Sequence, residues 1–205
     1  HRDLHSFPTR RSSDLAEIAL LESTEQIQQQ ARQEQLLNQI ANQIRISLDL
    51  DYILQTTVRE IGRFLKVDRC YFAWYVPDET DAHWHVIAEE RHSDLSSLMG
   101  RHSEDCLGQL LAILRRLQIL RVDEAATVEA PELRDALAAS EHQSVLALPV
   151  WSESCRFGAI ACIHERDARS WRDEDVEFLD AILAQVAIAI RSEERRVGKE
   201  CRSRW

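Results

Sequence analysis

Apolar and polar residues recur along the chain with two different periods, and the change of period separates expected helices from expected strands. Over residues 16–48 there is no Gly or Pro, and Gln, Glu, Arg and Ala dominate the composition. Apolar side chains recur there at helical spacing, at Leu20, Ile27, Leu37, Ile40 or Ala41, Ile44 and Leu48. The pattern predicts a long, coiled-coil-like helix whose apolar seam is interrupted by polar residues. A single amphipathic helix lying on its own domain is the alternative.

A second helix and a hairpin are predicted next. Asp49 or Asp51 provides a helix N-cap, and residues 52–66 then place apolar side chains on one face. Residues 70–76 and 83–89 are aromatic or alternate in polarity, and the turn sequence Pro77-Asp78-Glu79 follows the first of them. These features predict an antiparallel pair of strands.

The second half of the chain predicts more strands and a closing helix. Ser170 and Asp173 have the spacing of a capping box before a helix over residues 171–190. The other predicted elements are an irregular segment over 92–105, helices over 107–116 and 131–139, and strands over 119–122, 144–151 and 156–165. The order predicts an α+β fold, in which helices flank an antiparallel sheet and the long helix precedes it.

The two ends of the chain share an unusual property. Residues 1–15 and 191–205 can be encoded by opposite strands of one DNA stretch that resembles a sequencing adapter. We therefore expect both segments to be foreign, which leaves residues 16–48 as a signalling helix and residues 49–190 as one domain.

Charge and composition exclude several classes of function. The terminal segments hold nine of the 25 basic and five of the 35 acidic residues, so residues 16–190 carry a net charge of −14. Nucleic acids and anionic membranes are bound by basic surfaces, so neither is expected as a partner. No apolar run is long enough to span a bilayer, and the cysteines outside the terminal segments form no regular framework. We expect a cytoplasmic protein with free thiols.

Several motifs in the chain occur together in one known family. They are residues 44–60 (IRISLDLDYILQTTVRE), 68–71 (DRCY), 145–150 (VLALPV), 158–164 (GAIACIH), 169–171 (RSW) and 184–190 (AQVAIAI). Together they resemble the GAF domain of bacterial, especially cyanobacterial, sensor proteins, and the resemblance covers residues 36–190. We read Pro149, Gly158 and Trp171 within these motifs as structural: Pro149 needs a strand edge or bulge, Gly158 a close backbone approach, and Trp171 plugs the start of the last helix.

The resemblance implies a sensory and dimerisation module of a multidomain signal-transduction protein. The parent protein is expected to be a two-component histidine kinase, with its kinase or another output domain in the same chain. A small ligand or a partner would signal through the flanking helices, which would form a homodimer. We expect no catalytic residue in this chain and no metal ligands, because no motif has the required spacing. The sequence does not identify the ligand. The candidate pocket residues are Tyr71, Trp74, Cys106, Cys162 and His164.

Three alternatives remain open, and one of them is a ligand-free dimerisation spacer, which the sequence does not distinguish from a sensor. In bilin-binding GAF domains a cysteine, usually followed by histidine, attacks the tetrapyrrole; here Leu107 follows Cys106, which argues against a bilin. Some stand-alone GAF proteins reduce methionine sulfoxide with loop cysteines, for which Cys106 and Cys155 are the candidates, whereas Cys70 and Cys162 are expected to be buried and inert. The Asn-Lys signature of cyclic-nucleotide-binding members is missing from the sequence.

Overall fold

The computed structural model describes residues 10–47, 49–77, 82–103, 113–114, 116, 118–152 and 156–203. The chain divides into two compact units, residues 1–39 and 40–205. Helix α1 (Arg10–Ile46) makes up most of the first unit. The second unit holds the remaining elements, which are α2 (Leu50–Leu65), β1 (Arg69–Val76), β2 (His83–Arg91), β3 (Gly100–Ser103), β4 (Leu120–Val122), η2 (Ala125–Thr127), α4 (Pro131–Ala139), β5 (Ser144–Trp151), β6 (Phe157–His164) and α5 (Asp173–Ser203). None of the helices in the described ranges combines the length and apolar character needed to cross a membrane.

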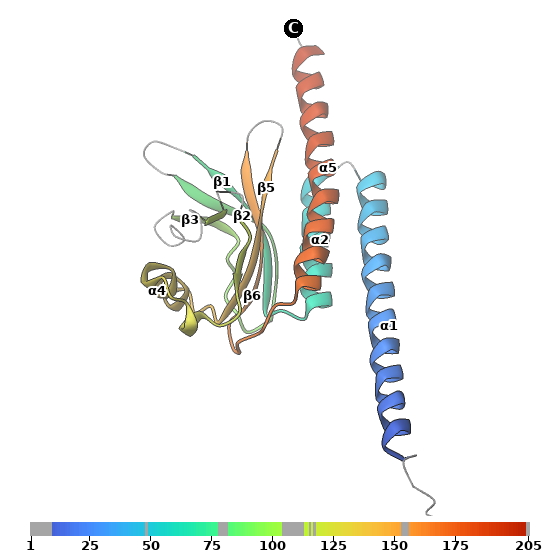
Figure 1. Ribbon diagram of the computed structural model, residues 1–205. Helices are drawn as coiled ribbons and strands as arrows, with labels where there is room; N and C mark the ends of the chain where they lie inside the picture. Colours follow the sequence, from blue (N-terminus) through green and yellow to red (C-terminus); the bar gives the residue numbers. More distant parts are fainter. Residues whose placement is uncertain are drawn as a thin grey trace, which may run out of the picture. The chain divides into compact units, whose positions relative to one another are not determined.

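A single sheet forms the centre of the second unit. Its six strands are antiparallel and run in the order β3-β2-β1-β6-β5-β4. Figure 1 shows α2 and α5 side by side against one face of the sheet, with α4 on the opposite side. This arrangement confirms the predicted α+β fold. Strand β3 was not predicted from the sequence, because its residues GRHS carry no apolar alternation.

The first residues of α2 and α5 show how local sequence fixes the helix ends. Asp49 is the N-cap of α2, and its carboxylate accepts a hydrogen bond of 3.1 Å from the backbone N–H of Tyr52. The predicted capping box of α5 is shifted along the chain, because the buried carboxylate of Asp175 accepts from the backbone N–H of Arg172 at 3.0 Å. Ser170 instead donates its hydroxyl to Asp123 at 3.1 Å.

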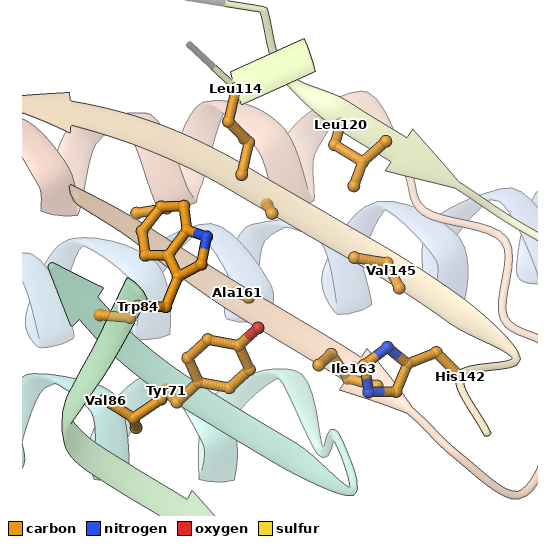
Figure 2. A pocket seen from close by; sticks show the side chains of 12 residues that line it. Tyr71, Trp84, Val86, Leu114, Leu120, His142, Val145, Ala161 and Ile163 are labelled. Carbon is orange, nitrogen blue, oxygen red and sulfur yellow. The ribbon is translucent and has the colours of Figure 1, made fainter. Parts of the chain in front are cut away.

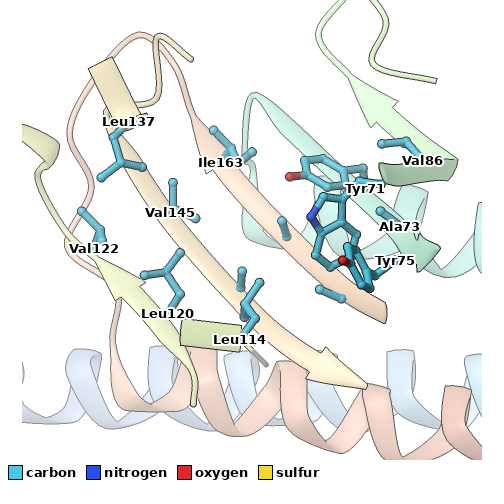
Figure 3. Close-up of a cluster of buried hydrophobic side chains, with 14 of the residues drawn as sticks. Tyr71, Ala73, Tyr75, Val86, Leu114, Leu120, Val122, Leu137, Val145 and Ile163 are labelled. Carbon is cyan, nitrogen blue, oxygen red and sulfur yellow. The ribbon is translucent and has the colours of Figure 1, made fainter. Parts of the chain in front are cut away.

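Strand β1 is buried on both faces, because successive side chains of a strand point to opposite sides. Tyr71, Ala73 and Tyr75 belong to a cluster on the face opposite the helix pair, drawn in Figure 3. Cys70 lies on the other face, where its Cβ is 3.5 Å from the position that a Cβ on Gly62 of α2 would occupy. The central strands therefore separate a helix-packed core from a second apolar layer.

A bulge in β2 determines which side chains of this strand face each layer. Phe72 pairs with Ala88 and Ala73 with Val86, so Ile87 is the extra residue of β2. Val86 consequently faces the layer opposite the helices, whereas Glu90 comes within 3.3 Å of a Cβ on Gly62 of α2. Without the extra residue, the two ends of β2 would present the wrong side chains to one of the layers.

Pro149 and Gly158 occupy the kinds of position that the sequence predicted. Pro149 pairs with Ala159 of β6, while β4 pairs with β5 only from Val145 to Ala147, so β5 is an edge strand at the proline. A Cβ on Gly158 would lie 2.7 Å from the ring of Trp74 and 2.9 Å from the carbonyl oxygen of Ala73. The indole therefore packs directly on the backbone of β6.

We predict that Gly158→Ala lowers the free energy of unfolding by about 1–3 kcal/mol, because the added methyl group overpacks a rigid ring and a backbone carbonyl. Gly62→Ala is the matched control. Its Cβ would meet the flexible side chain of Glu90 at 3.3 Å, and removing a helical glycine contributes about 0.5–1 kcal/mol of stability. Urea denaturation of the three proteins measures both effects. Equal stability of Gly158→Ala and the wild type would contradict the described packing of Trp74.

Candidate functional site

A small cavity lies on the face of the sheet opposite α2 and α5. Its volume is about 30 Å³. The side chains that line it are Tyr71, Ala73, Trp84, Val86, Leu114, Leu120, His142, Val145, Ala147, Ala159, Ala161 and Ile163. They come from strands β1, β2, β4, β5 and β6 and from the segments before β4 and β5 (Figure 2). The cavity is therefore built on the most central strands of the sheet.

Four alanines form the floor of the cavity. Ala73 of β1 pairs with Ala159 of β6, and Ala161 of β6 pairs with Ala147 of β5. All four point to the same side of the sheet, because they belong to the same buried cluster. Methyl side chains at these positions leave free space above three adjacent strands, and larger neighbours such as Trp84 and Tyr71 form the walls.

Two polar atoms at this site lack a hydrogen-bond partner among the described residues. They are Nε1 of Trp84 and Nδ1 of His142, whose side chains are 3% and 5% exposed. The indole N–H is only a donor, whereas a neutral imidazole has one donor and one acceptor nitrogen. An unpaired buried polar group costs about 1–3 kcal/mol, so a molecule that satisfied these atoms would recover part of that cost.

The Tyr71 hydroxyl is the third polar group of the cavity. In Figure 2 this hydroxyl and the Trp84 indole nitrogen point toward the space between the two rings and His142. Burial raises the pKa of Tyr71 to about 12, so the phenol is protonated at neutral pH. Burial also lowers the pKa of His142 to about 4, with a further contribution from the positive charge of Arg69. The three polar side chains of the cavity are therefore uncharged at pH 7.

The buried guanidinium of Arg69, near the cavity, is already bound by other groups of the protein. Its Nη1 atom binds the Glu89 carboxylate and donates to the carbonyl oxygen of Ser96 at 2.9 Å. Its Nε atom lies 2.7 Å from a carboxylate oxygen of Glu165. Arg69 and Glu89 are both 3% exposed, and Glu89 also accepts from the hydroxyl of Ser97 at 2.6 Å. The network fixes the loop after β2 and leaves the charge of Arg69 compensated.

Of the predicted pocket residues, Tyr71 lines the cavity, whereas Trp74 and Cys162 lie on the other face. The reason is the alternation of side chains along β1 and β6. The Trp74 ring contacts Phe72 edge to face at 5.0 Å and lies under the guanidinium of Arg156, whose central carbon is 4.4 Å from the ring centre. Cys106, as well as Cys155, lies outside the described residues, as does most of the helix predicted over 107–116.

Cys162 and Cys70 face one another across β6 and β1. They are direct pairing partners, their sulfur atoms are 3.7 Å apart, and both are buried free thiols, as the sequence analysis expected. Burial raises the pKa of Cys70, with further contributions from Cys162 and Glu90. A thiolate is the reactive form of cysteine, so the raised pKa of Cys70 and the burial of both thiols do not favour a nucleophilic role.

His164 lies at the end of β6 and away from the cavity. Its Nδ1 atom is 3.7 Å from the Asp68 carboxylate, and its ring is 5.8 Å from that of Trp171. Burial lowers the pKa of His164. Trp171 is fully buried and donates its indole N–H to the carbonyl oxygen of Val122 at 3.2 Å, which agrees with its predicted structural role. In the part of the chain that the structure describes, no group of three or more acidic, His or Cys side chains is suited to a metal ion.

Trp84 and His142 were not predicted from the sequence as site residues. Trp84 stands between two histidines in an alternating strand, and that alternation already indicated that it faces the opposite side from them. His142 precedes β5, and only the folded chain shows that its ring is buried beside residues that are distant in sequence. No local pattern identified it.

Solved structures of known proteins share this fold. The phycocyanobilin-bound GAF domain of a cyanobacterial phytochrome has a TM-score of 0.69 at 24% identity, and the match covers 80% of this chain and 96% of that chain. Free methionine-R-sulfoxide reductase from Neisseria meningitidis in complex with its substrate has a TM-score of 0.63 at 14% identity, covering 81% and 92%. At these identities the similarity establishes the fold alone.

The relatives in sequence are histidine kinases. The circadian input-output histidine kinase CikA of Thermosynechococcus vestitus is 29% identical over an alignment of 177 residues, which covers 82% of this chain and 24% of that protein. CikA of Synechocystis sp. is 25% identical over 189 residues, covering 78% and 24%. The chain thus spans about a quarter of the length of the curated relatives that it matches.

The buried His142 predicts a pH dependence of stability. Its pKa falls from 6.5 in the unfolded chain to about 4 in the folded protein, so the unfolded state binds a proton first as the pH falls. The contribution of His142 to the free energy of unfolding is fully present above pH 6.5 and is lost progressively as the pH falls to 4. The total loss is about 3 kcal/mol. We expect His142→Gln to lose this part of the pH dependence in urea denaturation between pH 4 and pH 7. Identical pH profiles of the two proteins would contradict a buried neutral imidazole.

The family of the chain follows from its central region. A model of the GAF domain family matches residues 49–190, which are more than half of the 205 residues. The match agrees with the antiparallel sheet and its flanking helices, and it confirms the resemblance seen in the sequence. The chain belongs to the GAF domain family.

Proposed function

We propose that this chain is a sensory GAF module and that its parent is a cytoplasmic histidine kinase. The observation that carries the proposal is the cavity, in which buried polar atoms of Trp84 and His142 have no partner among the described residues. Buried polar groups are normally hydrogen-bonded, so unpartnered polar atoms beside a cavity suit a site that a ligand completes. The similarity to CikA kinases supports an output domain in the same protein.

The signal would pass through the sheet to the helices. Tyr71 and Ala73 line the cavity, while Cys70 and Phe72 of the same strand face the side covered by α2 and α5. A ligand that repositions β1 therefore acts on the packing of α2 and α5. Phe64 of α2 and Phe178 of α5 are in ring contact at 4.5 Å, so the two helices respond together. Ligand binding would then shift the population between two helix packings, without chemistry in this domain.

The N-terminal helix would provide the dimer contact. Leu20 and Ile27 lie seven positions apart in the sequence and are 68% and 65% exposed. This spacing matches one apolar position of the heptad repeat of a coiled coil. We propose a homodimer through α1, whose contacts change with the state of the sensory domain.

We predict that the chain is dimeric in sedimentation equilibrium and that the double variant Leu20→Lys/Ile27→Lys weakens the dimer at least about tenfold, because charges replace the apolar seam. Ile18→Lys is the matched control. Ile18 is 52% exposed, but its position in the seven-residue repeat lies away from the seam, so its replacement leaves the dimer intact. A wild-type chain that remains monomeric at high concentration would contradict the proposed dimer.

The terminal segments lead to a test at the level of the gene. We propose that residues 1–15 and 191–205 derive from a sequencing adapter and that the natural protein continues on both sides of residues 16–190. Long-read sequencing through both junctions is expected to show a reading frame that runs beyond Ile190 into a phospho-acceptor histidine helix and an ATP-binding domain. A stop codon directly after Ile190 would contradict the kinase parent and favour a stand-alone protein.

The cavity does not fit a bilin. A site for a ligand of that size typically has a volume of about 300–1,000 Å³, against about 30 Å³ between the described side chains. Its described lining also contains no Lys or Arg to bind the propionate groups of a bilin. We therefore propose a module without a bilin, although bilin-bound GAF domains are similar in fold.

The methionine sulfoxide reductase alternative requires a reactive thiol. Of the cysteines inside residues 16–190, Cys70 and Cys162 are buried, and the pKa of Cys70 is raised. Neither suits a nucleophile. The alternative thus depends on Cys106 and Cys155, which lie outside the described residues.

A further inference from the structure

We infer that the cavity of the proposed sensory module selects an uncharged small molecule with a carbonyl-type acceptor beside an N–H or O–H donor, the simplest example being a primary amide. The inference rests on the proposed function, because it names the ligand class of the same site. It is carried by the chemistry of Trp84, His142 and Tyr71 and by the state of Arg69.

The indole of Trp84 requires an acceptor from the ligand. Its Nε1–H is a donor that finds no acceptor among the described residues, and the side chain is 3% exposed. An indole N–H cannot accept a hydrogen bond, so a group without an acceptor atom leaves it unsatisfied. A carbonyl oxygen between the Trp84 and Tyr71 rings would accept from the indole and from the protonated phenol.

His142 adds the requirement for a second polar group. Its Nδ1 atom is unpartnered within the described part of the chain, and the ring is neutral at pH 7 because burial lowers its pKa to about 4. A neutral imidazole presents a donor or an acceptor at Nδ1, depending on the tautomer. A primary amide can pair with either tautomer, because its carbonyl oxygen accepts and its NH2 group donates, and both are bonded to the same carbon.

The ligand is uncharged because the cavity has no charge to pair with it. No Lys, Arg, Asp or Glu is found among the described lining residues. The guanidinium of Arg69 already binds Glu89, Glu165 and the carbonyl of Ser96. Placing a carboxylate or phosphate in this apolar site would bury an unpaired charge, which is far more costly than burying an amide. The lining thus discriminates against anions.

Size is the second selective property. A cavity needs about 10–15 Å³ to hold one water molecule, so a volume of about 30 Å³ accommodates two or three small groups. The alanine floor sets this limit, because a larger side chain at Ala73 or Ala161 would fill the space. Acetamide and acetate are suitable probes, since they have the same shape and differ in charge and in the donor.

The test uses the Trp indole N–H resonances of the 15N-labelled chain, with the Trp84 signal assigned from Trp84→Phe. We expect acetamide to shift the Trp84 signal in a saturable manner, and acetate at equal ionic strength to bind at least about tenfold more weakly. The Trp171 signal is the internal control, because its N–H is already bonded to the carbonyl of Val122 and should not move. In Trp84→Phe, acetamide should bind about tenfold more weakly when followed at the His142 ring.

The possible failures are distinguishable. If acetate binds as tightly as acetamide, the ligand class is wrong and a ligand-binding cavity remains. If neither probe gives a saturable shift at Trp84, the cavity holds water only, and both the ligand class and the sensory role of the cavity are overturned. The dimerisation through α1 and the kinase parent are tested separately and would not be affected.

Discussion

The central strands β1, β6 and β5 must be apolar on both faces, and the helix pair and the cavity both follow from this constraint. Because side chains alternate along a strand, Cys70 and Phe72 face the layer beside α2 and α5, while Tyr71 and Ala73 face the opposite layer. The extra residue in β2, Ile87, extends this division to the neighbouring strand. A change in one layer therefore acts on a strand that is also part of the other.

The chemistry of the cavity separates this domain from members of its fold that hold large or anionic ligands. Its floor is made of alanines, its polar groups are neutral, and the nearby Arg69 is neutralised by Glu89 and Glu165. A shared fold does not determine the ligand, because specificity depends on the side chains of one site. Here these side chains favour a small uncharged molecule and exclude the pairing that an anion needs.

The sequence predicted the fold more completely than the site. Asp49, Pro149, Gly158 and Trp171 have roles that local physics determines, and the structure agrees with each of them. The strand β3 was missed because it lacks apolar alternation.

The pocket residues are harder to predict, because they converge from five strands and their neighbouring segments. Strand alternation already implied that Tyr71 and Trp74 face opposite sides, yet both were candidates. His142 has no local signal at all, because only the burial of its ring beside the sheet makes it part of the cavity.

The most direct test of the account is whether occupancy of the cavity changes the dimer. Sedimentation equilibrium would measure the dimer dissociation constant with no probe and with enough acetamide to saturate the Trp84 indole signal. The account predicts a change of about fivefold or more in the wild type, the lower end of typical couplings between sites, and a smaller change in Trp84→Phe. An unchanged constant, with the Trp84 signal showing an occupied cavity, would contradict the proposed connection between the sheet and the helices.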